Sequence, residues 1–134
     1  MIEARNVEND PERARYWVNF VLERCEFPNN ELLRLQFDEA ELGDFCNCGC
    51  NSFAVKTREG VALLSSGGSF GAIFDAWFPL EGEPNSLEII LFTGETGRLE
   101  YVEVDCCGNS FPVPDDIRLA GSVQHGHVSG TLIT

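Results

Sequence analysis

The sequence predicts an α+β fold in which one or two N-terminal helices pack on a mainly antiparallel sheet of about five strands. The N-terminal part carries a helical pattern of apolar residues, whereas the remainder carries short apolar runs separated by turn residues. Two of those runs flank a short glycine-containing loop, which is typical of an antiparallel hairpin. We expect residues 1–134 to form a single domain, because a chain of 134 residues with 43% hydrophobic side chains can bury a core.

The first predicted helix begins at Pro11. Asp10 can accept hydrogen bonds from the free N–H groups of the first turn, and proline is favoured at the first helical position because it needs no N–H partner there. Apolar residues then recur at helical spacing along one face: Ala14, Trp17, Val18, Val21 and Cys25. We expect this face to pack on the sheet, with Trp17 in the hydrophobic core.

Residues 31–37 allow two interpretations. As a short helix, the segment would be capped by Asn30. As a strand, it would show Leu33, Leu35 and Phe37 in alternation. We favour the helix.

The rest of the chain predicts strands. Residues 87–93 and 98–105 are rich in β-formers and flank Gly94-Glu95-Thr96-Gly97, so these two runs are expected to pair as an antiparallel hairpin. Other apolar runs that end at turn residues cover 40–45, 52–57, 61–64 and 72–78, and weaker candidates lie around residue 119 and at 128–133.

The chain is strongly acidic. Its 22 acidic and 9 basic residues give a formal net charge of −13, and Lys56 is the only lysine. Nucleic acids and anionic membranes bind through lysine and arginine, so we expect no nucleic-acid partner and no membrane partner. The charge would attract a basic protein, although it also favours solubility. The candidate contact residues lie at or after the hairpin: Glu100, Glu103, Asp115 and Asp116.

The sequence predicts neither a leader peptide nor a membrane span. Its start, MIEARNVEND, has acidic residues where a leader has a basic flank and an apolar run. No apolar run approaches the roughly 20 residues that cross a bilayer. We therefore expect a cytoplasmic protein with reduced thiols, and we do not interpret its cysteines as a disulfide framework.

The densest chemistry is the run Cys46-Asn47-Cys48-Gly49-Cys50. In an extended chain, residues two apart point to one side, so the three sulfurs could converge. Paired zinc ligands are usually separated by roughly two to four residues, and this spacing departs from that pattern. We favour reduced structural cysteines with no cofactor and no stoichiometric zinc, and a metal- or redox-responsive site is the alternative. Residues that could complete a metal site are Cys106, Cys107, His125 and His127.

We expect no catalytic site. The segment Gly67-Gly68-Ser69-Phe70-Gly71 matches the G-x-S-x-G nucleophile elbow, but that motif needs a helix after it. Residues 72–78 predict a strand instead. The nearby carboxylates Glu100, Glu103 and Asp105 share one predicted strand and are explained by a solvated face.

The segments FCNCGCNSFAV, LEIILFTGETGRLEYVEVD and FPVPDD together resemble small bacterial proteins of unknown function that carry a C-x-CGC-x-S segment and an LEV-type hairpin. Hairpins of this kind are distantly similar to those of bacterial toxin-immunity proteins. The resemblance covers roughly residues 40–116 and has Val102 where leucine is expected. It implies a compact α+β module without catalysis. Taken with the acidic charge, it makes a protein-binding module, specifically an immunity-like inhibitor of a basic partner, our leading expectation, and a metal- or redox-responsive protein that uses Cys46, Cys48 and Cys50 is the alternative.

Overall fold

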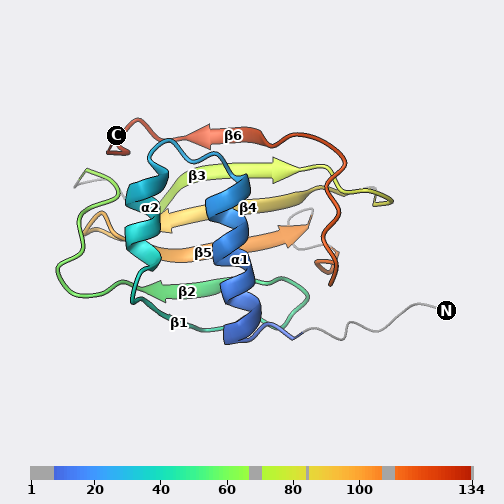
Figure 1. The fold of residues 1–134 in the computed structure, drawn as a ribbon, viewed down its shortest axis with the longest axis horizontal. Coiled ribbons are helices and arrows are strands. Elements are labelled where there is room, and N and C mark those ends of the chain that lie inside the picture. Colours follow the sequence, from blue (N-terminus) through green and yellow to red (C-terminus); the bar gives the residue numbers. More distant parts are fainter. Residues whose placement is uncertain (1–7, 67–70, 84, 107–110, 134) are drawn as a thin grey trace.

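The computed structural model describes residues 8–66, 71–83, 85–106 and 111–133 (Figure 1). Within these residues, two helices and a six-stranded antiparallel sheet form the predicted α+β fold, with one strand more than expected. The helices are α1 (Pro11–Arg24) and α2 (Asn30–Phe37). The strands are β1 (Glu41–Gly43), β2 (Phe53–Lys56), β3 (Gly71–Phe78), β4 (Leu87–Thr93), β5 (Leu99–Cys106) and β6 (Gln124–Val128).

Both helices begin at asparagine or aspartate caps. The Asp10 carboxylate accepts a 2.8 Å hydrogen bond from the backbone N–H of Arg13, as the sequence predicts. The cap of α2 is Asn29, whose side-chain oxygen accepts a 3.1 Å hydrogen bond from Leu32 N–H. The prediction of Asn30 as the cap is therefore wrong by one residue. Asn30 is the first helical residue, and its amide donates to the carbonyl of Leu22 at 2.8 Å, which ties the two helices together.

The strand order across the sheet is β1-β2-β5-β4-β3-β6. The predicted β4–β5 hairpin is confirmed, with Leu91 opposite Val102, and it forms the centre of the sheet. Strand β1 lies at one edge and β6 at the other, as Figure 1 shows. The loop between β1 and β2, which carries the cysteine run, is consequently separated from β6 by the width of the sheet.

Two predicted strands differ from the structure. Residues 61–64 form no strand: they belong to a loop that buries only the side chains of Val61 and Leu64, and Leu64 N–H donates to the carbonyl of Gly97 at 2.9 Å. At the C-terminal end, the strand is Gln124–Val128, earlier than the predicted 128–133. Its polar sequence suits an exposed edge strand, and residue Leu119 makes only an isolated bridge to Leu80.

The hydrophobic core lies between the helices and one face of the sheet. Trp17 is fully buried, as predicted, and Phe20 of α1 packs edge-on against Phe78 of β3 with ring centroids 5.1 Å apart. In Figure 1 both helices lie on this same face. Alternate residues of the central strands point the other way and form what we call the open face: Asp75, Trp77, Glu88, Ile90, Phe92, Tyr101, Glu103 and Asp105.

None of the helices in the described part of the chain is long and apolar enough to cross a membrane.

Candidate functional site

The open face carries aromatic side chains that the core does not use. Trp77 of β3 is 39% exposed although tryptophan is usually well buried. Phe92 of β4 and Tyr101 of β5 lie opposite each other and meet edge to face, with centroids 6.0 Å apart. Large, rigid aromatic side chains of this kind are common anchors in protein interfaces.

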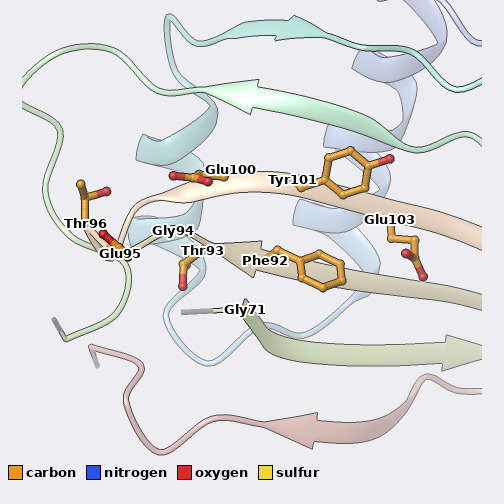
Figure 2. Close-up of a pocket in the computed structure, with 9 residues that line it drawn as sticks. All are labelled: Gly71, Phe92, Thr93, Gly94, Glu95, Thr96, Glu100, Tyr101 and Glu103. Atoms are coloured by element: carbon orange, nitrogen blue, oxygen red, sulfur yellow. The ribbon is translucent and has the colours of Figure 1, made fainter. Parts of the chain in front are cut away.

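A hollow of about 590 Å³ opens beside this aromatic pair (Figure 2). A β-bulge shapes it: Phe92 faces Tyr101 and Thr93 faces Leu99, so Glu100 is the extra residue of β5. Bulges redirect side chains at sheet edges and rims. As a result, Glu100 lines the same hollow as Tyr101 and Glu103.

Carboxylates from three neighbouring strands crowd the rest of the open face. Burial, a hydrogen bond to Asp75 and the negative charge of Asp75 raise the pKa of Glu88 to about 7. Burial, a hydrogen bond to Asp105 and the negative charge of Asp105 raise the pKa of Glu103 to about 7. Ionised carboxylates only accept hydrogen bonds, so each of these contacts requires a proton on one partner. The group is therefore partly protonated near neutral pH.

Two oxygens of this group have no partner among the described residues. Oδ1 of Asp75 and Oδ1 of Asp105 are buried and accept no hydrogen bond there. Ion pairs elsewhere among the described residues include Arg34 with Glu31, Arg58 with Glu39, and Arg118 with Asp116. Buried carboxylate oxygens are costly to leave unpaired, so these two oxygens make it less favourable for the whole group to be ionised.

The structure brings together only half of the contact residues predicted from the sequence. Glu100 and Glu103 line the hollow. Asp116 instead pairs with Arg118 at 2.9 Å and lies close enough to Tyr16 of α1 to raise the pKa of that phenol, alongside the larger effect of burial. Asp115 precedes it in the segment between β5 and β6. Asp115 and Asp116 are therefore not part of the hollow.

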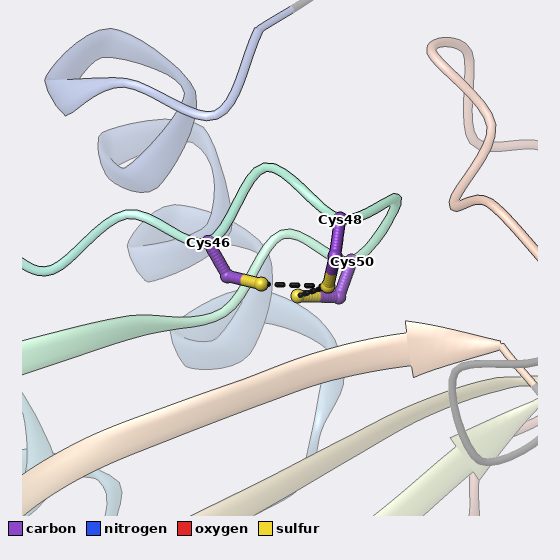
Figure 3. Close-up of side chains that lie close together, drawn as sticks. All are labelled: Cys46, Cys48 and Cys50. Carbon is purple, nitrogen blue, oxygen red and sulfur yellow. Dashed lines mark hydrogen bonds between the residues drawn. The ribbon is translucent and has the colours of Figure 1, made fainter.

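The three predicted thiols do converge (Figure 3). Cys46 Sγ lies 2.7 Å from Cys48 Sγ, which is 3.6 Å from Cys50 Sγ. Cys48 is exposed and Cys50 is buried. Hydrogen bonds with Cys48 and Cys50, followed by burial, raise the pKa of Cys46 to about 12, so this thiol is protonated at neutral pH.

The loop that carries these thiols is held by a polar network that the sequence did not indicate. The Asn9 amide donates to the carbonyls of Cys46 and Ser52, at 2.8 and 2.7 Å. The side-chain oxygen of Asn51, fully buried, accepts from Trp17 Nε1 at 2.8 Å and Arg13 Nε at 3.0 Å. Asn9, just before α1, together with Arg13 and Trp17 of α1, therefore fixes both ends of the cysteine loop.

The other predicted metal ligands lie apart from this cluster. Cys106 is buried at the end of β5, and it does not belong to the convergent group. Cys107 lies outside the described residues. His125 and His127 are on β6, four strand spacings from β2 or roughly 19 Å. His125 Nε2 instead meets the carbonyl oxygen of Cys25 at 2.8 Å.

Comparisons with family models, curated proteins and solved structures return no match to this chain.

Proposed function

We propose that this protein is a non-catalytic binding module that uses its open face to bind a basic partner protein. The observation that carries the proposal is the combination, on one face, of exposed Trp77 with a carboxylate group whose members repel one another. An arginine from a partner would pair with these carboxylates and stack on the Trp77 ring, because guanidinium groups bind both carboxylates and aromatic rings.

Charge supports the same partner. With a net charge of −13, the chain attracts cationic surfaces at long range. On the open face, a cation beside Glu88 or Glu103 would lower the pKa of these carboxyl groups from about 7. Binding near neutral pH would then release protons, which distinguishes this face from an ordinary acidic surface.

An arginine-rich peptide provides the first test of this function. We expect nuclear magnetic resonance shifts at physiological salt to concentrate on the open face, including the Trp77 indole and the Glu103 amide. Trp77→Ala should weaken binding roughly tenfold, as expected for an aromatic anchor. Tyr16→Ala is the matched control, since Tyr16 is an equally exposed aromatic on α1. Shifts spread evenly over the helices, or equal losses in both variants, would rule the open face out.

The resemblance to immunity proteins supports an inhibitory form of this function, with a basic toxin as partner. Co-production of this chain with a candidate toxin should restore growth of the producing cells. The double variant Glu100→Lys, Glu103→Lys should fail to protect, because it reverses two charges at the hollow. Protection that survives the double variant would place the inhibitory contact elsewhere.

A further inference from the structure

The thiol cluster at the β1–β2 edge of the sheet is a feature that the proposed binding function does not use. Its members Cys46, Cys48 and Cys50 all have sulfurs within 4.8 Å of one another (Figure 3). None of the three lines the hollow shown in Figure 2. Cysteines that serve only as small apolar packing groups have no need to point their sulfurs at a common centre.

We propose that Cys46, Cys48 and Cys50 bind one monovalent copper ion through three thiolates. Three sulfurs at about 2.3 Å from a central ion lie roughly 3.7–4.0 Å from one another. The Cys48–Cys50 separation of 3.6 Å is already close to that range. The 2.7 Å between Cys46 and Cys48 must widen, and rotation of the exposed Cys48 side chain can provide this.

The number of ligands favours copper(I) over zinc. Structural zinc takes four ligands, usually with roughly two to four residues between paired cysteines. Among the described residues, the group of ligands that converges here contains three thiols and no histidine or carboxylate. Soft thiolates select Cu(I), and a d¹⁰ monovalent ion accepts trigonal coordination by three sulfurs.

Hydrogen bonds and a tight turn within the protein already hold the cysteine loop in its conformation. Asn9 holds the carbonyls of Cys46 and Ser52, and Cys46 N–H also donates to the Ser52 carbonyl at 3.1 Å. At the turn, Gly49 has φ of +115°, a conformation that other residues rarely adopt, and its carbonyl accepts from Val113 N–H at 2.8 Å. Supporting hydrogen bonds of this kind orient metal ligands and raise affinity.

An ion can reach the sulfurs from solvent. A hollow of about 650 Å³ lies beside Cys48 and Cys50, and Glu8 on its wall adds negative charge that attracts a cation. Binding transfers up to three thiol protons to solvent as the thiolates form, and copper enters and stays as Cu(I). No electron transfer is required.

The test is a titration of the fully reduced, full-length protein with Cu(I) under anaerobic conditions, against a competing Cu(I) chelator. We expect one copper per chain, and X-ray absorption should show three sulfur neighbours. Zinc titrated in parallel should be lost on dialysis. Stoichiometric zinc that survives dialysis, or no copper uptake by protein with its thiols shown to be free, would overturn the proposal.

Single-residue variants distinguish copper binding at this cluster from copper binding at any other thiol of the protein. Cys48→Ser should reduce copper affinity at least about 100-fold without unfolding the protein, because Cys48 is exposed. Cys25→Ala is the matched control: it removes a buried thiol on the far side of the core and should leave the affinity unchanged. Gly49→Ala keeps all three thiols but strains the turn, so it should also weaken binding. Equal effects of Cys48→Ser and Cys25→Ala would overturn the assignment to this cluster.

Discussion

Glu88 and Glu103 hold their protons more tightly in the folded protein than in an unfolded chain. Their pKa is raised to about 7 when folded, whereas an unperturbed glutamate titrates at about 4.3. The folded protein therefore binds more protons than the unfolded chain between these two values. Stability falls with rising pH wherever the folded state holds more protons, so this contribution is present below about pH 4 and is lost as pH rises through about 7.

Glu88→Gln should therefore raise the melting temperature at about pH 8 and change it little near pH 5. At the higher pH the glutamine removes a charge that repels Asp75, and at the lower pH its amide replaces the donor that protonated Glu88 supplies. Thermal unfolding followed by circular dichroism across this range checks the prediction. Glu59→Gln, at an exposed loop position, is the control and should show no such pH dependence. The prediction would be contradicted if both variants changed the melting temperature by the same amount at about pH 8 and at about pH 5.

Asn51 joins helix α1 to the cysteine loop through one side chain. Its oxygen accepts hydrogen bonds from Trp17 Nε1 and Arg13 Nε, and its amide donates to the Cys50 carbonyl. Asn51→Ala would leave a buried indole N–H without an acceptor and remove one acceptor from a guanidinium. We expect the free energy of unfolding to fall by about 3 kcal/mol.

Urea denaturation measures this loss. Asn30→Ala removes one exposed side-chain hydrogen bond to Leu22 and should cost less than about 1 kcal/mol. Similar losses in the two asparagine variants would show that the buried network adds little.

Among the elements, the β4–β5 hairpin depends on its loop. Gly97 has φ of +79°, and a Cβ there would lie 2.3 Å from the backbone oxygen of Ser65. Its carbonyl also accepts from the backbone N–H groups of Leu64 and Ser65, two buried residues, and so holds their loop in place. The hairpin loop is therefore a packing site as well as a turn.

Gly97→Ala should lower the free energy of unfolding by about 3 kcal/mol, through positive φ and the clash with Ser65. Gly60→Ala is a close match, because Gly60 has φ of +80° but no atom within 4 Å of its Cβ position. It should cost about 1 kcal/mol, from conformation alone. Denaturant unfolding of both variants gives the difference, and equal losses would mean that the loop shifts to relieve the contact.

The elements that the sequence could predict are those with strong local signals. Helix α1 has a capping residue, a proline and a regular apolar face, and the β4–β5 hairpin has two alternating runs around a glycine loop. Strand β6 has no such signal: Gln124-His-Gly-His-Val128 is exposed throughout and pairs with β3 only as an edge. The cap of α2 was missed by one position because Asn29 and Asn30 are equally suited by residue type.

The candidate sites, too, could be predicted only as far as local sequence patterns reach. Glu103 was predicted as a contact residue from its own strand, but its neighbours Asp75 and Glu88 come from other strands, and only the register places them together. The convergence of Cys46, Cys48 and Cys50 was suggested by local spacing. The exclusion of His125 and His127 depends on strand order, which local spacing does not contain.

At the scale of the whole molecule, the charge distribution determines how a partner approaches. The net charge of −13 acts in all directions, whereas the open face adds a local group of carboxylates and aromatic side chains. Long-range attraction raises association rates and is screened by salt, with a Debye length of about 10 Å at 0.1 M. Short-range contacts on the open face determine dissociation instead.

We therefore expect the association rate of an arginine-rich peptide to fall steeply as salt rises, while DNA and RNA of similar length do not bind. Glu100→Lys with Glu103→Lys should slow association and speed dissociation, because both residues line the hollow. Stopped-flow measurement of the exposed Trp77 fluorescence follows both rates.

The matched control for this experiment is Glu23→Lys with Glu59→Lys, since both residues are exposed and the pair changes the formal net charge by the same amount. Glu23 belongs to α1, and Figure 2 shows the helices on the opposite side of the sheet from the hollow. If the open face is the contact, the control should lower the association rate modestly through net charge and leave dissociation unchanged. If the acidity serves solubility alone, both double variants will behave alike and neither will alter dissociation.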